Sequence, residues 1–170
     1  MSKSVARQRN SLKHMRFMWF SAVLLVAILK AGQLLAEAPI MSAEQALESV
    51  ASGDIVLIDI RSEQEWKESG LAAGAWPISM HRPDFATQLQ TLLAQYAPEK
   101  IALICATGGR SSYIAEVLER NGIAGVVDVS EGMFGNQRGK GWIEKGLPLV
   151  DLKDAADAYD AARDTWAATN

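Results

Sequence analysis

Short apolar runs of strand character alternate along this chain with segments whose apolar residues recur at helical spacing. The strand-like runs occupy residues 55–60, 75–78, 100–105 and 126–129. Brief, nearly continuous apolar runs are typical of strands that are buried on both faces of a parallel sheet. The intervening residues 61–70 are mostly charged or polar, and we predict a turn there.

Three segments show the features of helix starts. Ser42 and Gln45 form a capping-box pair at the beginning of a predicted helix over residues 42–52. Asp84 is placed to cap a second helix, and Ser111 opens a third. Strands that alternate with helices predict an α/β domain with a mostly parallel central sheet flanked by helices.

The N-terminal segment has a different character from the rest of the chain. Its first 16 residues contain five lysines and arginines and no acid, and a largely apolar run follows at residues 17–29. A basic start, a short apolar run and small residues near Ala36 and Ala38 are features of an export signal. The run is shorter than the ~18 apolar residues of a spanning helix. We expect residues 1–38 to be a signal peptide or, alternatively, an uncleaved membrane anchor, and the protein to be periplasmic.

The remainder divides into a domain over residues 39–150 and an alanine-rich tail over residues 151–170. The tail carries apolar residues at near-helical spacing, so a docking helix and a partly ordered tail both remain open. Past residue 38 the chain has 11 basic and 19 acidic residues. This negative charge argues against nucleic acid and anionic membrane surfaces as partners.

The chain contains one cysteine, Cys105, and past the N-terminal segment one histidine, His81. A single cysteine forms no internal disulfide, and a lone thiol in an exported protein is a candidate reactive group. These residues do not supply the ligand set of a structural zinc site. We predict no metal and no cofactor.

Cys105 ends an apolar strand and precedes a glycine-containing loop and a helix. Gly108 and Gly109 allow a tight turn whose backbone N–H groups can form an anion-binding nest. The helix N-terminus and Arg110 add positive charge at the same place. These surroundings favour a thiolate. The alternative, a small buried apolar cysteine, does not account for the two glycines and the arginine.

Three segments resemble the rhodanese family in the order in which that family has them. The segment Cys105 to Ser111, with cysteine first and Arg110 sixth, is similar to its active-site loop. Asp59 and Arg61, followed by Glu65 and Trp66, resemble its acid-x-arginine segment, and residues 141–148 resemble its closing motif. The resemblance covers residues 42–149 and implies a three-layer rhodanese-like domain.

The resemblance also implies a reaction and its residues. A sulfane sulfur would pass from a donor such as thiosulfate to cyanide or a thiol through a persulfide on Cys105. Asp59 and Arg61 would support the site, and Leu71 stands where many relatives have histidine. The expected substrate-binding residues are Ala106, Thr107, Gly108, Gly109, Arg110 and Ser111. His81 and Arg82 follow the second strand, and we expect them to be solvated loop residues, with a place at the mouth of the pocket as the alternative.

Two other functions remain open. Phosphatases and arsenate reductases also use a cysteine and an arginine around a cradle of N–H groups, but they typically have five residues between the two. Here there are four, residues 106–109. The second alternative is a non-catalytic binding or persulfide-sensing module. A pure scaffold would need neither the cysteine nor the arginine, and both are present here.

Overall fold

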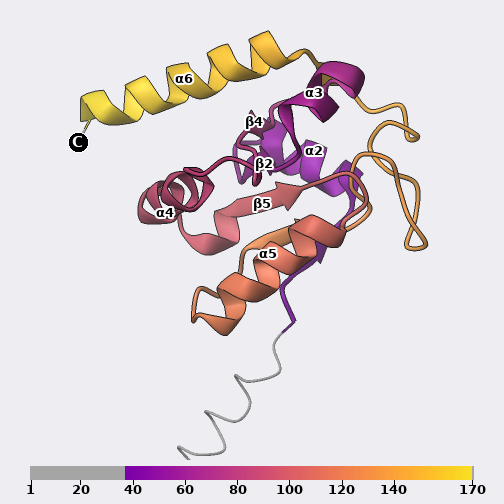
Figure 1. The fold of residues 1–170 in the computed structure, drawn as a ribbon, viewed down its shortest axis with the longest axis horizontal. Coiled ribbons are helices and arrows are strands. Elements are labelled where there is room, and N and C mark those ends of the chain that lie inside the picture. Colours follow the sequence, from indigo (N-terminus) through magenta and orange to yellow (C-terminus); the bar gives the residue numbers. More distant parts are fainter. Residues whose placement is uncertain (1–36, 170) are drawn as a thin grey trace, which may run out of the picture. The chain divides into compact units, whose positions relative to one another are not determined.

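A parallel sheet lies at the centre of the computed structural model, which describes residues 37–169 (Figure 1). Its strand order is β1-β6-β5-β2-β4, and every neighbouring pair is parallel. The strands are β1 (Ile40–Met41), β2 (Val56–Asp59), β4 (Trp76–Pro77), β5 (Ile101–Ile104) and β6 (Val127–Val129). β3 (Leu71–Ala72) and β7 (Leu149–Val150) form a separate antiparallel pair. The predicted α/β class with a mostly parallel central sheet is confirmed.

Helices flank this sheet (Figure 1). They are α2 (Ala43–Ala51), α3 (Glu63–Ser69), α4 (Phe85–Gln95), α5 (Gly109–Arg120) and α6 (Leu152–Thr169), with a 3₁₀ turn at Pro98–Lys100. Helix α2 begins as predicted, because Ser42 and Gln45 form a capping box. No helix in residues 37–169 has the length and apolar character needed to cross a membrane. The apolar run at residues 17–29 lies outside the described part of the chain.

The prediction of a turn over residues 61–70 is wrong, because most of this segment forms α3. The Ser62 hydroxyl accepts a hydrogen bond from the Glu65 N–H, and the Glu65 carboxylate accepts one from the Ser62 N–H. This reciprocal capping satisfies N–H groups that a helix start leaves without partners. The charged composition therefore belongs to a short, well-capped surface helix.

Two helix starts also differ from the predictions. Helix α5 begins at Gly109 rather than at Ser111, and Gly108 is its N-cap in a left-handed conformation. Asp84 precedes α4 but makes no capping hydrogen bond with its side chain. Its carboxylate instead accepts a hydrogen bond from Arg82, with an Nε–Oδ1 distance of 3.0 Å.

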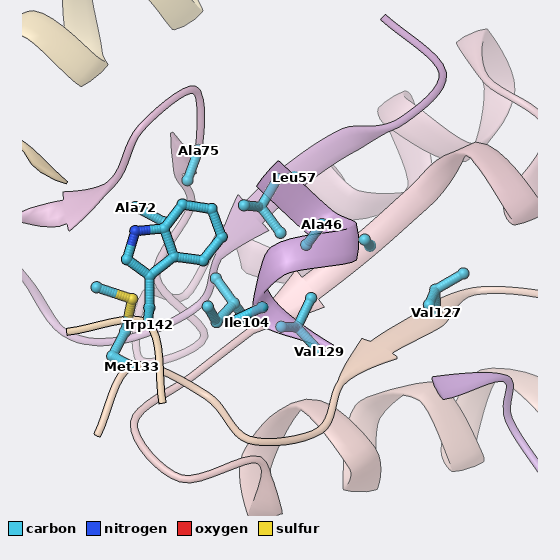
Figure 2. Close-up of a cluster of buried hydrophobic side chains, with 11 residues drawn as sticks. Ala46, Leu57, Ala72, Ala75, Ile104, Val127, Val129, Met133 and Trp142 are labelled. Atoms are coloured by element: carbon cyan, nitrogen blue, oxygen red, sulfur yellow. The ribbon is translucent and has the colours of Figure 1, made fainter. Parts of the chain in front are cut away.

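The central strands contribute to two hydrophobic clusters, one on each face of the sheet. Leu57 and Ile104 pack with α2 and Trp142 in the cluster shown in Figure 2. Ile58 and Cys105 belong to the opposite cluster, together with residues of α4 and α5. Because successive strand residues point to opposite faces, the end of β5 directs Cys105 toward the α5 side.

Trp142 occupies the first cluster as a core residue, in agreement with the prediction (Figure 2). Its indole Nε1–H donates to the Pro148 carbonyl at 2.8 Å, and the same carbonyl accepts the Ala73 N–H at 3.0 Å. Burial of a tryptophan requires such a partner for its polar edge. This contact fixes the segment that leads into β7.

The C-terminal segment forms α6 and packs against the domain, so of the two alternatives the docking helix is the one observed. Tyr159 lies against Trp76 of β4, with ring centroids 5.3 Å apart. Ala155 is buried with Trp66 of α3 and Leu71 of β3. The helix thereby covers one edge of the sheet and one end of α3.

Asp59 and Arg61 form a fully buried ion pair at the carboxyl end of β2. Arg61 Nε lies 3.0 Å from both carboxylate oxygens, and Nη2 lies 2.7 Å from Oδ2. Arg61 Nη1 also donates to the Ser69 hydroxyl at 2.8 Å, and Nη2 donates to the Gly70 carbonyl at 2.7 Å. The pair therefore joins the end of β2 to the C-terminal end of α3.

Removal of Arg61 should destabilise the fold strongly. Arg61→Met leaves the Asp59 carboxylate buried without its cation, and breaking a buried pair in this way costs ~3–5 kcal/mol. Urea unfolding followed by circular dichroism measures the free energy of unfolding. The matched control is Arg82→Met, which removes an exposed pair with Asp84 and should cost less than ~1 kcal/mol. Equal losses in the two variants would contradict this interpretation of the buried pair.

Candidate active site

Cys105 lies directly after β5, at the carboxyl end of the central strand of the sheet. Its side chain is only 1% exposed, and the Ser111 hydroxyl lies 3.4 Å from Sγ. Ligands of open parallel α/β sheets bind at this end of the strands. The structure thus brings the predicted nucleophile, the loop and the N-terminus of α5 together at one place.

The loop after Cys105 is held from one side by the segment after β6. The carbonyls of residues 105–107 accept hydrogen bonds from the Met133 N–H at 2.9 Å, the Phe134 N–H at 2.8 Å and the Asn136 side-chain amide at 2.7 Å. In a trans peptide the N–H points away from the carbonyl of the same unit. The N–H groups that follow these carbonyls are therefore directed away from residues 133–136.

These loop N–H groups have no protein acceptor. Within residues 37–169, no backbone N–H of residues 106–111 donates a hydrogen bond to a backbone or side-chain atom. Unpaired N–H groups at the start of a helix attract negative charge. The predicted substrate-binding residues thus provide a set of donors beside the sulfur of Cys105.

Position 108 requires glycine for two reasons, its backbone conformation and the lack of space for a side chain. Its φ is +82°, and a Cβ built on it would lie 2.0 Å from the Ser130 carbonyl oxygen. The adjacent Gly109 has no positive φ, and a Cβ added there would meet no atom within 4 Å. The two glycines that the sequence presents as equivalent therefore have different roles.

Arg110 is held by Glu65 of α3 through two hydrogen bonds. Nη1 lies 3.0 Å from Oε2, and Nη2 lies 2.5 Å from Oε1. The hydrogen bond from Arg110 is the main cause that lowers the pKa of Glu65 to about 2. Glu65 in turn raises the pKa of Arg110, and Cys105 makes a smaller contribution in the same direction. Glu65 thus fixes the position of the cation at the site.

His81 is an exposed loop residue, as expected, and it also reaches the site. Its Nε2 lies 3.3 Å from Arg110 Nη1, which agrees with the alternative of a place at the mouth of the pocket. Arg82 does behave as a surface residue and pairs with Asp84. A cavity of about 600 Å³ lies between α3, α4, α6 and residues 77–82, and His81 lines it. Open space therefore adjoins the Arg110 end of the loop.

Sequence reasoning missed the role of Glu65 beside Arg110. The capping motif of Ser62 and Glu65 was visible in the sequence and would have predicted α3. The contact with Arg110 spans 45 positions of the chain and depends on the fold. Leu71, the position at which the resemblance to the rhodanese family leads us to expect histidine, is fully buried in β3.

Alanine at the two loop glycines should separate their roles. Gly108→Ala forces a Cβ against the Ser130 carbonyl, so we expect a distorted loop and a clear loss of stability, since non-glycine residues at strained positive φ cost about 1 kcal/mol or more. Gly109→Ala should be close to neutral. Thermal unfolding of both variants measures the difference. Equal melting temperatures would show that the Ser130 contact does not constrain the loop.

The Glu65–Arg110 pair predicts a pH dependence of stability. Because the pKa of Glu65 is about 2 in the folded protein and 4.5 ordinarily, its stabilising contribution is present above pH 4.5 and is lost as the pH falls toward 2. Glu65→Gln should remove this part of the loss of stability at acidic pH. Urea unfolding between pH 5 and about 2.5 measures it. An unchanged pH profile in the variant would contradict the pairing.

Comparison with known proteins agrees with this geometry. The family model of the rhodanese-like domain matches residues 42–138. An uncharacterized protein of Rickettsia rickettsii is 23% identical over 108 residues, which are 58% of this chain and 85% of the relative. The crystal structure of Rv0390 from M. tuberculosis has a TM-score of 0.51 and 25% identity. The match covers 68% of this chain and 98% of the Rv0390 chain. The polysulfide-sulfur transferase homodimer from Wolinella succinogenes has 28% identity and a TM-score of 0.48. The match covers 74% of this chain and 88% of the transferase chain. The family match spans more than half of the chain, which therefore belongs to the rhodanese-like domain family.

Proposed function

We propose that this protein is a sulfurtransferase that moves a sulfane sulfur from a donor such as thiosulfate to cyanide or a thiol. The carrier is a persulfide on Cys105. The observation that carries the proposal is the sulfur of Cys105 at the start of a loop whose N–H groups lack acceptors in the described residues. Family membership supports sulfur transfer in general terms.

The reaction is a two-step covalent transfer. The Cys105 thiolate attacks the outer sulfur of thiosulfate, the sulfur–sulfur bond of the donor breaks, and sulfite leaves with the electron pair. The acceptor then attacks the terminal sulfur of the persulfide, and the Cys105 thiolate leaves. The thiolate is regenerated, so no external oxidant or reductant is needed.

The residues around Cys105 have separate tasks in this scheme. The Ser111 hydroxyl, 3.4 Å from Sγ, stabilises negative charge on the cysteine sulfur. The N–H groups of the loop and Arg110 hold the terminal sulfur and the oxygens of the departing sulfite. Glu65 holds the Arg110 guanidinium in place by accepting hydrogen bonds from both of its terminal nitrogens. The Arg110 side chain therefore loses less conformational freedom when the donor binds. Asp59 and Arg61 support the site by fixing α3, which carries Glu65.

Export is part of the proposal and rests on the sequence alone. The basic start and the apolar run at residues 17–29 support a periplasmic location of the domain. In that compartment a lone thiol has no internal disulfide partner.

The identity of the nucleophile can be tested by intact mass. Thiosulfate should add the mass of one sulfur atom to the protein, and later addition of cyanide should remove it with release of thiocyanate. Cys105→Ser should show neither step. Formation of the adduct without turnover to cyanide or thiols would favour the persulfide-sensing module, and full turnover by the serine variant would exclude the mechanism.

The role of Arg110 can be tested by exchange of its head group. Lysine offers a point charge and cannot bind Glu65 and an anionic donor with the same planar fork. Arg110→Lys should keep the fold and lower kcat/KM for thiosulfate by about tenfold or more, the effect of one lost charged hydrogen bond. Arg120→Lys, on the exposed side of the same helix, is the matched control. The prediction fails when the two variants have the same steady-state kinetics.

A further inference from the structure

The cavity next to Arg110 is formed in part by a helix that lies outside the family match. It has a volume of about 600 Å³ and is bordered by α3, α4, α6 and the segment after β4. Helix α6 begins at Leu152, whereas the family model matches residues 42–138. Tyr159 and Arg163 of α6 nevertheless line the cavity. The C-terminal helix therefore completes a hollow beside the reactive loop.

The size of this cavity exceeds what the small reactants of the proposed mechanism need. Thiosulfate and cyanide are small anions, for which the loop N–H groups and Arg110 suffice. Cavities of ~300–1,000 Å³ are typical of sites that bury organic ligands. His81 lines the cavity, and its Nε2 lies 3.3 Å from Arg110 Nη1. An organic molecule in the cavity would therefore lie next to the reactive loop.

Two nearly buried residues that line the cavity have hydrogen-bond donors without an acceptor. Ser79 is 4% exposed, and its Oγ accepts the His81 N–H at 3.2 Å, but within residues 37–169 its hydroxyl donates to no atom of the protein. Trp66 is 5% exposed, and its indole Nε1–H has no hydrogen-bond partner among the described residues. Buried donors of this kind are rare, because each costs free energy. A ligand in the cavity can supply the missing acceptors.

Charged groups of both signs surround these donors. The carboxylates in the cavity wall belong to Glu63 and Asp84, and its guanidinium groups belong to Arg82 and Arg163. Arg82 pairs with Asp84, but both side chains are accessible, and such pairs contribute little to stability. Charged groups of a ligand can therefore replace these partners at low cost. A lining with both signs of charge suits a molecule that carries a carboxylate and an ammonium group, as short peptides do.

We propose that this cavity binds the sulfur acceptor, and that the acceptor is a short-peptide thiol with a free carboxylate and an ammonium group. This inference rests on the proposed persulfide of Cys105. The donors of Ser79 and Trp66 and the charge of Arg163 hold carboxylates of the acceptor, and its thiol extends past His81. The acceptor thiolate attacks the terminal sulfur, and the sulfur–sulfur bond breaks with its electron pair on Cys105. The product is the persulfide of the acceptor.

The acceptor half of the reaction tests this site separately from the donor half. The persulfide is formed with thiosulfate, excess donor is removed, and loss of the added sulfur is followed by intact mass after addition of glutathione, 2-mercaptoethanol or cyanide. Trp66→Phe removes an N–H that has no partner in the protein, so the rate with glutathione should fall about fivefold, the effect of one lost hydrogen bond. The rates with 2-mercaptoethanol and cyanide should not change. An equal loss with all three acceptors, or no loss with glutathione, overturns the inference.

Arg163 provides a second test at the surface of the cavity. Arg163→Gln removes the positive charge that α6 contributes, so the rate with glutathione should fall about threefold, in the range of one accessible ion pair. The rate with cyanide should stay the same. Arg120→Gln removes an exposed arginine of α5 that pairs with Glu116 and does not line the cavity, and it is the matched control. Equal rates with glutathione in the two variants contradict the inference.

Binding without sulfur transfer separates this inference from the proposed function. S-methylglutathione has no thiol and Cys105→Ser forms no persulfide, so calorimetric titration of this variant with this ligand measures occupation of the cavity alone. We expect saturable binding, with a Kd that Trp66→Phe in the same background raises about fivefold. Absence of binding overturns the inference even when sulfur reaches cyanide. Binding to Cys105→Ser, together with no thiosulfate adduct in the wild-type protein, contradicts the proposed function alone.

Discussion

The buried ion pair of Asp59 and Arg61 is the interaction on which the geometry of the site depends. Arg61 uses its guanidinium to satisfy the Asp59 carboxylate and also to bind Ser69 and Gly70 at the end of α3. A buried charge pair gives little net stability, but it fixes the two groups in one arrangement because neither tolerates loss of the other. Here that arrangement sets the position of α3 relative to the carboxyl end of the sheet.

Helix α3 in turn positions the loop that follows Cys105, through the contact between Glu65 and Arg110. Glu65 has two roles, since the same carboxylate caps the N-terminus of α3 and binds Arg110. On the other side, the segment after β6 holds the loop carbonyls. The loop is thus fixed from both sides before any donor binds, which is the preorganisation that stabilises developing charge most effectively.

Much of this fold could be predicted from the sequence because its strands are short apolar runs and its loop carries glycines at a strand end. Cys105, Arg110 and Trp142 were identified in this way, and the structure places the first two at the loop and the third in the core. The missed features depend on tertiary contacts. Residues 61–70 have the composition of a turn, and only the capping pair of Ser62 and Glu65 reveals α3. Nothing local in the sequence brings His81 or Glu65 to Arg110, because these contacts join residues 29 and 45 positions apart.

In the proposed function, loop size is the feature that separates sulfur transfer from phosphoryl chemistry. Four residues lie between Cys105 and Arg110, and Gly108 lies so close to the Ser130 carbonyl that a side chain at this position has no room. We expect a ring of this size to suit one terminal sulfur better than a tetrahedral phosphate or arsenate.

The most direct measurement of this claim compares two rates in the same preparation, thiosulfate-to-cyanide sulfur transfer and hydrolysis of an aryl phosphate. The account predicts sulfur transfer that depends on Cys105 and no detectable phosphatase activity. Robust hydrolysis of the aryl phosphate that depends on Cys105 would contradict it.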